Sequence, residues 1–224
     1  SAATGCNYVG YIKWTCAHLK LDTAWFDEEL QLVLKGARKL SLRIGITSAV
    51  DKQILTDGVI KQLNALADVR GLEAWACQAL MAWEFLLRVQ SEAIDLESGR
   101  SSDAISLPPH RHSGVWVESN SVLVLRLQKR KHRAAGSLLK RTCQCRMVGP
   151  SMCVAHRMQP LLVRTVVGCK LFSYTATQFL NILKKLLIQL SIQHAEAFTL
   201  KAFRAGKATA LANSGAPLGQ IFAA

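Results

Sequence analysis

The segment from Leu72 to Leu87 is the most regularly patterned stretch of the sequence and places the strongest limit on the fold. Its apolar residues recur at the period of an α-helix, about 3.6 residues, along the whole segment. They are Leu72, Trp75, Ala76, Ala79, Leu80, Trp83, Leu86 and Leu87. Because a helix with such a broad apolar face is stable only when other elements cover it, we expect a buried core helix over residues 72–87.

Several other segments also show helical spacing or composition. The remaining predicted helices cover residues 8–19, a stretch that follows Asp22 or Thr23 and extends to Ala37, and residues 53–67, 174–190 and 201–212. The last of them is followed by Gly215, which can take the left-handed C-terminal conformation, and by Pro217, which suits the first turn of another helix. His194 falls in the connection before that helix and is expected on the surface.

A β-hairpin is predicted after residue 114. Residues 115–117 and 122–127 are rich in β-branched and aromatic side chains and flank a polar turn at residues 118–121. The expected fold class is therefore mainly α with a small β-hairpin or sheet, that is, α+β.

Two domains are expected. Residues 41–50 break the helical period and are typical of a linker. Residues 1–45 would form a partial helical domain, because two short helices make only a thin core, and residues 46–224 would form the main domain. The first residue is Ser1 and not an initiator methionine, which suggests a fragment or a processed chain.

The basic residues are concentrated in the second half of the chain. Residues 1–103 contain 11 Lys and Arg against 13 Asp and Glu, a net charge of −2, whereas residues 104–224 contain 17 against 2, a net charge of +15. Such an excess favours binding to a polyanion. A basic surface alone leaves DNA, RNA and an acidic protein open as partners.

The sequence contains no signal for a membrane or for secretion. Its apolar runs are shorter than the roughly 18 to 20 residues that cross a bilayer, and residues 1–6 lack the basic and apolar regions of a signal peptide. The seven cysteines, an odd number, favour a reducing compartment over a disulfide framework. We expect an intracellular protein with no membrane partner, in the nucleus if the source is eukaryotic.

A group of metal-ligand residues lies within residues 141–157. Cys143, Cys145, Cys153 and His156 could close one tetrahedral, structural Zn²⁺ site around a Gly-Pro turn. This spacing is less diagnostic than paired Cys-x-x-Cys units. The alternative is that the cysteines pack as small reduced side chains and that the histidine is incidental.

Basic side chains supply the candidate binding residues. Lys201 and Arg204 are three residues apart, so they share one helix face that is either an anion site or an ordinary solvated face. Arg88 follows the core helix at once, and by its position alone it would be a solvated arginine near a helix C-terminus. The cluster at residues 128–133 is typical of a phosphate-facing loop or a nuclear-import patch.

Two of these segments resemble the conserved boxes of the tyrosine recombinases, the phage-integrase and Cre-like superfamily. Lys201-x-x-Arg204, followed by Ala-x-x-x-Thr-x-Leu-Ala-x-x-Gly215, is similar to the second box, which usually begins His-x-x-Arg. Leu87-Arg88 with Ser91-Glu92 resembles the first box with one extra residue, and in that family the chain breaks just before the arginine. Lys201 stands where the family has histidine, a departure that leaves the role of Arg204 intact and the proton-handling role of its neighbour open.

The resemblance implies a catalytic domain that binds double-stranded DNA, preceded by the end of a helical core-binding domain. Arg88 and Arg204 would hold the phosphate to be cleaved, with Lys201 beside them, and a hairpin lysine, Lys131 or Lys129, would protonate the leaving 5′-oxygen. The residues expected to contact DNA are Arg126, Arg130, Arg133 and Lys207. Catalysis of this type uses a 3′-phosphotyrosine and no cofactor, and full-length recombinases assemble as oligomers on paired DNA sites.

The position of the tyrosines limits this expectation. In the family the nucleophilic tyrosine follows the second box, whereas the tyrosines of this sequence are Tyr8, Tyr11 and Tyr174, all before Arg204. We therefore expect that this polypeptide alone does not cleave DNA and that it is a DNA-binding part of an incomplete recombinase. The alternatives are a non-catalytic DNA-binding protein derived from a mobile element, and an RNA-binding or acidic-partner module.

Overall fold

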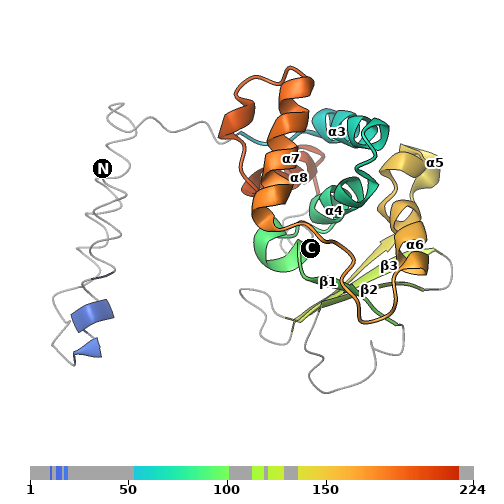
Figure 1. Ribbon diagram of the computed structural model, residues 1–224, viewed down its shortest axis with the longest axis horizontal. Coiled ribbons are helices and arrows are strands. Elements are labelled where there is room, and N and C mark those ends of the chain that lie inside the picture. The colour runs from blue at the N-terminus through green and yellow to red at the C-terminus, as the bar shows by residue number, and fades with distance from the viewer. Residues whose placement is uncertain are drawn as a thin grey trace. The chain divides into compact units, whose positions relative to one another are not determined.

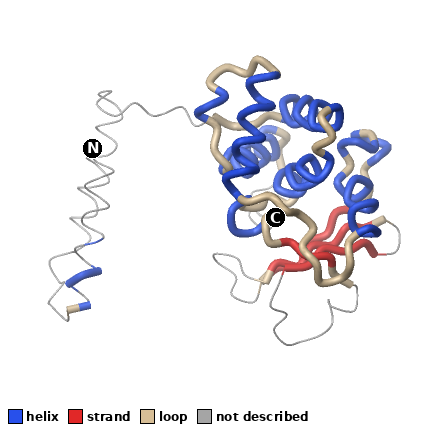
Figure 2. Tube along the Cα trace, in the orientation of Figure 1, coloured by secondary structure: helices blue, strands red, loops and turns tan. Residues whose placement is uncertain are grey.

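A computed structural model describes residues 11, 14–16, 18–19, 53–100, 113–118, 121–128 and 136–216 (Figures 1 and 2). The chain divides into two compact units, residues 1–52 and 53–224. In the first unit, Tyr11, Trp14 to Cys16 and His18 are helical, within the helix predicted over residues 8–19. The proposed linker at residues 41–50 lies outside the described residues, so the domain boundary at residue 45 stays a prediction.

The second unit combines helices with one β-sheet, and the α+β class is confirmed. Its helical elements are α3 (Asp57–Val69), α4 (Glu73–Glu84), η1 (Val89–Ala93), α5 (Cys145–Val148), η3 (Pro150–Met152), α6 (Val154–Arg164), α7 (Ala176–Gln189), η4 (Ala195–Ala197) and α8 (Lys201–Asn213). Its strands are β1 (Leu96–Ser98), β2 (Ser113–Glu118), β3 (Val122–Leu127) and β4 (Ser137–Thr142). Within the described ranges, no helix has both the length and the apolar character needed to span a bilayer.

The sheet has the strand order β1-β2-β3-β4. Strands β2 and β3 form the predicted hairpin, with Trp116 opposite Val124, and β4 pairs antiparallel with β3. Strand β1 pairs parallel with β2. The sequence analysis missed β1 and β4, because β1 has only three residues and β4 is a mixed apolar and basic segment.

Helix α4 is the centre of the unit and is buried on all sides. Every residue from Trp75 to Trp83 is buried, including the polar Gln78, which is completely inaccessible. The helix packs against α3, α6 and α8, and α6 in turn packs on β2, β3 and β4. Figure 1 shows α4 surrounded by the other helices, with the sheet below them. The predicted core helix is confirmed, although its C-terminal end is not.

The other helix boundaries follow local capping chemistry. The Thr56 hydroxyl accepts a hydrogen bond from the backbone N–H of Val59, so α3 begins at Asp57 and not at residue 53. Thr175 and Gln178 form a capping box at the start of α7. Helix α8 ends near Gly215, which has the expected left-handed φ of 77°, and His194 is exposed as predicted.

Candidate functional site

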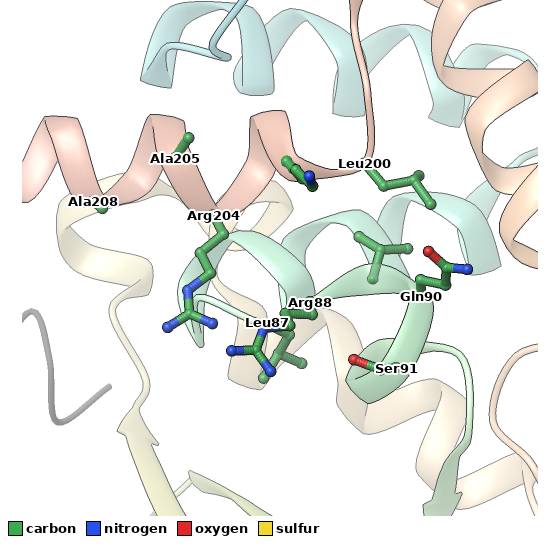
Figure 3. Close-up of a pocket in the computed structure, with 10 residues that line it drawn as sticks. Leu87, Arg88, Gln90, Ser91, Leu200, Arg204, Ala205 and Ala208 are labelled. Carbon is green, nitrogen blue, oxygen red and sulfur yellow. The ribbon is translucent and has the colours of Figure 1, made fainter. Parts of the chain in front are cut away.

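A pocket of about 560 Å³ brings together two segments that are more than a hundred residues apart in the sequence. Its described lining residues are Leu87, Arg88, Val89, Gln90, Ser91, Leu200, Lys201, Arg204, Ala205 and Ala208. Arg88 comes from the turn between α4 and η1, and Lys201 and Arg204 come from the first turn of α8. Figure 3 shows the guanidinium groups of Arg88 and Arg204 projecting to the same side of this pocket. We refer to it below as the cationic pocket.

The position of Arg88 depends on an abrupt end of α4. The core helix was predicted to continue to Leu87, but α4 stops at Glu84, and Leu86 has a left-handed φ of 50°. The N–H of Leu87 donates to Ala82 O (2.9 Å) and the N–H of Leu86 donates to Trp83 O (3.3 Å), the two hydrogen bonds of a Schellman motif. Leucine in this conformation costs about 1 kcal/mol or more, and no glycine marks the stop. The core helix therefore does not continue through Arg88.

Arg88 begins the next element and is oriented by its backbone. It has an extended conformation, and its N–H donates to Glu92 Oε2 (2.8 Å). The amide of the buried Gln78 donates to Ala93 O (3.3 Å) and fastens the short π-helix η1 to α4. The Arg88 guanidinium lies 3.9 Å from Glu92 Oε1 and its side chain is 39% exposed. Its backbone is thus fixed, while its head group remains accessible to a ligand.

Helix α8 is held against the core by the residues between and after its two cations. Ala202, Phe203 and Gly206 are buried, and the Phe203 ring packs against Phe179 at 5.6 Å between centroids. Gly206 lies so close to the backbone of Leu55 that a Cβ atom would overlap its carbonyl oxygen. This anchoring leaves the Lys201 and Arg204 side of the helix facing the cationic pocket.

The electrostatics of the cationic pocket favour an anion. None of its described lining residues is acidic, and within the described part of the chain Lys201 and Arg204 have no hydrogen-bond or ion-pair partner. The N-terminus of α8 adds a partial positive charge at the same place. Three cations that converge with so little compensation repel one another, and an oxyanion bridging their head groups would relieve that repulsion.

A second group of contacts holds the C-terminal end of α4 behind the pocket. Arg141 of β4 donates from Nε and Nη2 to Glu84 O (3.1 and 2.9 Å), and its guanidinium lies 5.0 Å from the centroid of the Phe85 ring. The pKa of Arg141 is lowered from its ordinary value, because burial disfavours the charged form and the negative charge of Glu84 offsets only part of this effect. Lys207 Nζ binds Glu84 Oε1 at 2.9 Å, with 17% and 18% of the two side chains exposed. We call Glu84, Arg141 and Lys207 the α4 clamp.

The α4 clamp changes the interpretation of one predicted residue. Lys207 was expected to contact DNA, but it is mostly buried, it is paired with Glu84, and it does not line the cationic pocket. The structure therefore places it among the residues that position the site. The sequence analysis missed Glu84 and Arg141, because neither residue lies in a recognisable motif and their contact spans 57 positions.

The remaining predicted DNA contacts are in or after β3. Arg126 is half-buried in β3, opposite Gly114 and Leu138, and does not line the cationic pocket. The other residues, Lys129, Arg130, Lys131 and Arg133, lie outside the described residues. In the sequence they fall between the last residue of β3 and the first residue of β4.

A second hollow, of about 630 Å³, differs from the cationic pocket in its charge balance. It is lined by Asp68, Arg157 and Tyr174, among others, and Arg157 forms two ion-pair contacts of 2.7 Å with Asp68. The charge of Arg157 is therefore balanced by Asp68. Tyr174 belongs to this hollow and is not among the lining residues of the cationic pocket.

Three of the four predicted metal ligands come together. The Sγ atoms of Cys143, Cys145 and Cys153 lie within 4.8 Å of one another and could hold a metal ion. Hydrogen bonds with Cys145 lower the pKa of the Cys143 thiol, and the side-chain hydrogen bond with Cys143 raises the pKa of Cys145 to about 12. His156 was expected to be the fourth ligand, but it is exposed on α6 and lines the second hollow. It is not part of the group of ligand atoms that lie within 4.8 Å of one another.

No family model matches the chain, and no curated protein matches it significantly.

Proposed function

We propose that the cationic pocket binds a backbone phosphate of double-stranded DNA and that the chain carries the phosphate-binding part of a tyrosine recombinase. The observation that carries this proposal is the convergence of Arg88, Lys201 and Arg204 in one pocket. The two segments were singled out for their likeness to the boxes that supply the phosphate-binding arginines in that superfamily. The net charge of +15 in residues 104–224 would strengthen any contact with DNA.

The chemistry of the three cations suits a phosphodiester. A guanidinium remains charged at physiological pH and can bind two phosphate oxygens through parallel hydrogen bonds. Arg88 and Arg204 come from different elements, so they can hold the same phosphate from two sides, and Lys201 can donate to a third oxygen. These contacts would strengthen as negative charge builds up in the transition state of a phosphoryl transfer. Lys131 or Lys129 would supply the proton for the leaving oxygen.

A structural Zn²⁺ ion at the cysteine cluster is part of this proposal. The cluster directly follows β4, which supplies Arg141 to the α4 clamp. Thiolates are preferred ligands of Zn²⁺, and closed zinc sites stabilise short loops that have little core of their own.

The second candidate is a DNA-binding protein without strand-cleaving activity. Tyr174 lines the second hollow, away from Arg88 and Arg204, and the other tyrosines precede it in the sequence. Both candidates use the cationic pocket in the same way and differ only in whether a covalent bond to DNA is formed.

Replacing Arg204 with alanine is expected to weaken binding to duplex DNA by about ten- to a hundredfold, the effect of losing one charge-assisted contact. The slope of log K against log salt should become shallower by about one. The measurement is fluorescence anisotropy of labelled duplex DNA over a salt series, with structured RNA of equal length in parallel.

Arg164→Ala is the matched control for this experiment. Arg164 is 68% exposed on α6, its Nε donates to Pro160 O of the same helix (3.2 Å), and its guanidinium has a 4.0 Å contact with Glu73. It carries the same charge outside the pocket, so its loss should change affinity by less than about threefold. If both variants weaken binding equally, the pocket is not the binding site, and stronger binding to RNA would favour the RNA-binding alternative.

A suicide DNA substrate separates the two candidates. The 224-residue chain is expected to form no covalent adduct with nicked duplex DNA, as judged by denaturing gel electrophoresis after incubation at low salt. A stable adduct would show that one of Tyr8, Tyr11 and Tyr174 acts as a nucleophile, and would overturn the expectation that this polypeptide cannot cleave DNA alone.

A further inference from the structure

The cysteine cluster lies in a tight loop between the sheet and α6. Cys143 directly follows β4, Cys145 begins α5, and Cys153 immediately precedes α6. The N–H of Cys143 donates to Ser121 O (3.1 Å), which ties the start of the loop to the turn before β3. The three sulfur atoms therefore come from three points of one loop whose two ends are both fixed to regular structure.

The distances between the sulfur atoms suit a shared metal ion. Cys143 Sγ lies 3.2 Å from Cys145 Sγ and 3.7 Å from Cys153 Sγ. Sulfur atoms at about 2.3 Å from a tetrahedral Zn²⁺ ion are about 3.8 Å apart, whereas bonded sulfurs are about 2.0 Å apart. The cluster is thus much closer to a set of metal ligands than to a disulfide.

The backbone of the loop is arranged around the sulfurs. The N–H of Gln144 donates to Cys153 Sγ (3.2 Å), a contact that stabilises negative charge on sulfur and orients the ligand. The N–H of Gly149 donates to Cys145 O (3.0 Å), and the N–H of Cys153 donates to Gly149 O (3.1 Å). These hydrogen bonds close the turn that brings Cys153 back to Cys145, so the loop approaches a ligand-binding geometry by its own contacts.

The number of ligands distinguishes this site from the one expected from the sequence. In the described part of the chain, no fourth His, Cys, Asp or Glu has a ligand atom within 4.8 Å of all three sulfurs. Cys153 is buried, whereas Cys143 is exposed, so one side of the cluster faces solvent. We infer that Cys143, Cys145 and Cys153 bind a thiophilic divalent cation, Zn²⁺ foremost, as three thiolates, with a solvent-supplied ligand in the fourth position.

This inference rests on the structural-zinc part of the proposed function and specifies its ligands. A failure of the chain to bind DNA would not affect it. A bound cation would join the end of β4 to the start of α6, two residues beyond the Arg141 contact with Glu84. Three protein ligands, unlike four, would leave one exchangeable position on the metal.

Titration of the reduced full chain with Co²⁺, followed by absorption spectroscopy, tests the site. One equivalent should produce intense thiolate-to-cobalt charge-transfer bands together with the visible bands of tetrahedral cobalt, and Zn²⁺ should remove them stoichiometrically. Cys143→Ser should weaken Co²⁺ binding by about a hundredfold or more. Because Cys143 is exposed, this variant should fold, which circular dichroism would verify.

Cys169→Ser is the matched control, since Cys169 is also exposed but is outside the cluster, and it should bind Co²⁺ like the parent chain. His156→Ala should likewise bind Co²⁺ as tightly as the parent chain does. In a separate measurement, a small added thiol should replace the solvent ligand and shift the visible bands of the bound Co²⁺. A folded chain that binds no Co²⁺, or a Cys143→Ser chain that binds it normally, would overturn the inference. Loss of Co²⁺ binding in His156→Ala would overturn the three-thiolate form.

Discussion

Replacement of Gly206 by alanine is expected to reduce the free energy of unfolding by about 3 kcal/mol, because there is no room for a side chain at this position. An added Cβ would overlap Leu55 O and would lie 2.9 Å from Trp83 Cζ3. The backbone of Leu55 and the buried indole of Trp83 cannot both move aside without separating α8 from α4. The same separation would shift Arg204 away from Arg88, so DNA affinity should fall together with stability.

Gly58→Ala is the control for this effect, since Gly58 is also helical but its added Cβ would meet only Thr56 Oγ1, at 3.9 Å. This variant should be neutral or more stable by up to about 1 kcal/mol, as expected for alanine in a helix. Both variants can be compared by urea denaturation followed by tryptophan fluorescence. Equal stability of the Gly206→Ala chain and the parent would show that α8 does not pack this closely on α4.

Glu84→Ala is expected to destabilise the chain by about 2 to 3 kcal/mol, because it leaves the mostly buried Lys207 ammonium without its partner. The loss should also loosen the last turn of α4, from which the chain leads into Arg88, and weaken DNA binding. Denaturation and anisotropy measurements on the same preparations would show both effects.

The double variant Glu84→Ala/Lys207→Met should recover more than half of the lost stability, since it removes the unpaired charge and keeps most of the side-chain volume. Asp95→Ala is the control: Asp95 forms a 2.7 Å ion pair with Lys170, but both side chains are about 60% exposed. Its loss should cost less than about 1 kcal/mol. Similar losses of unfolding free energy for Glu84→Ala and Asp95→Ala would show that the Glu84–Lys207 ion pair stabilises the chain no more than an exposed pair does.

Much of the fold could be predicted from local patterns. The spacing of apolar residues identified α4 and α7, helix-favouring composition identified α8, and β-branched and aromatic residues on both sides of a polar turn identified the β2–β3 hairpin. These helices and this hairpin are determined either by contacts between residues that are close in the sequence or by one broad apolar face that must be buried. Gly215 also took its predicted left-handed conformation, because a glycine after a helix has few competing interpretations.

The features that the sequence did not reveal depend on tertiary contacts. Leu86 adopts a left-handed conformation that leucine rarely takes, and the packed end of α4 compensates for its cost. Lys207 was predicted to contact DNA, because no local pattern links it to Glu84, its ion-pair partner in the structure. His156 has a suitable spacing from Cys153, but it lies in α6 and is not part of the cysteine cluster.

The cationic pocket itself was expected from resemblance and not from spacing. Nothing in the local sequence around Arg88 distinguishes it from an ordinary arginine after a helix. Its meeting with Arg204 depends on the sharp end of α4 and on the close approach of α8 at Gly206.

The most direct test of the account is a double-mutant cycle on duplex DNA affinity with Arg88→Ala, Arg204→Ala and the double variant. If both guanidinium groups hold one phosphate, either single change already disrupts the shared contact. The double variant should then lose at least about 1 kcal/mol less binding free energy than the two single losses added together. Losses that add within about 0.4 kcal/mol would contradict the account, because they would show that the two arginines act at separate places on the DNA.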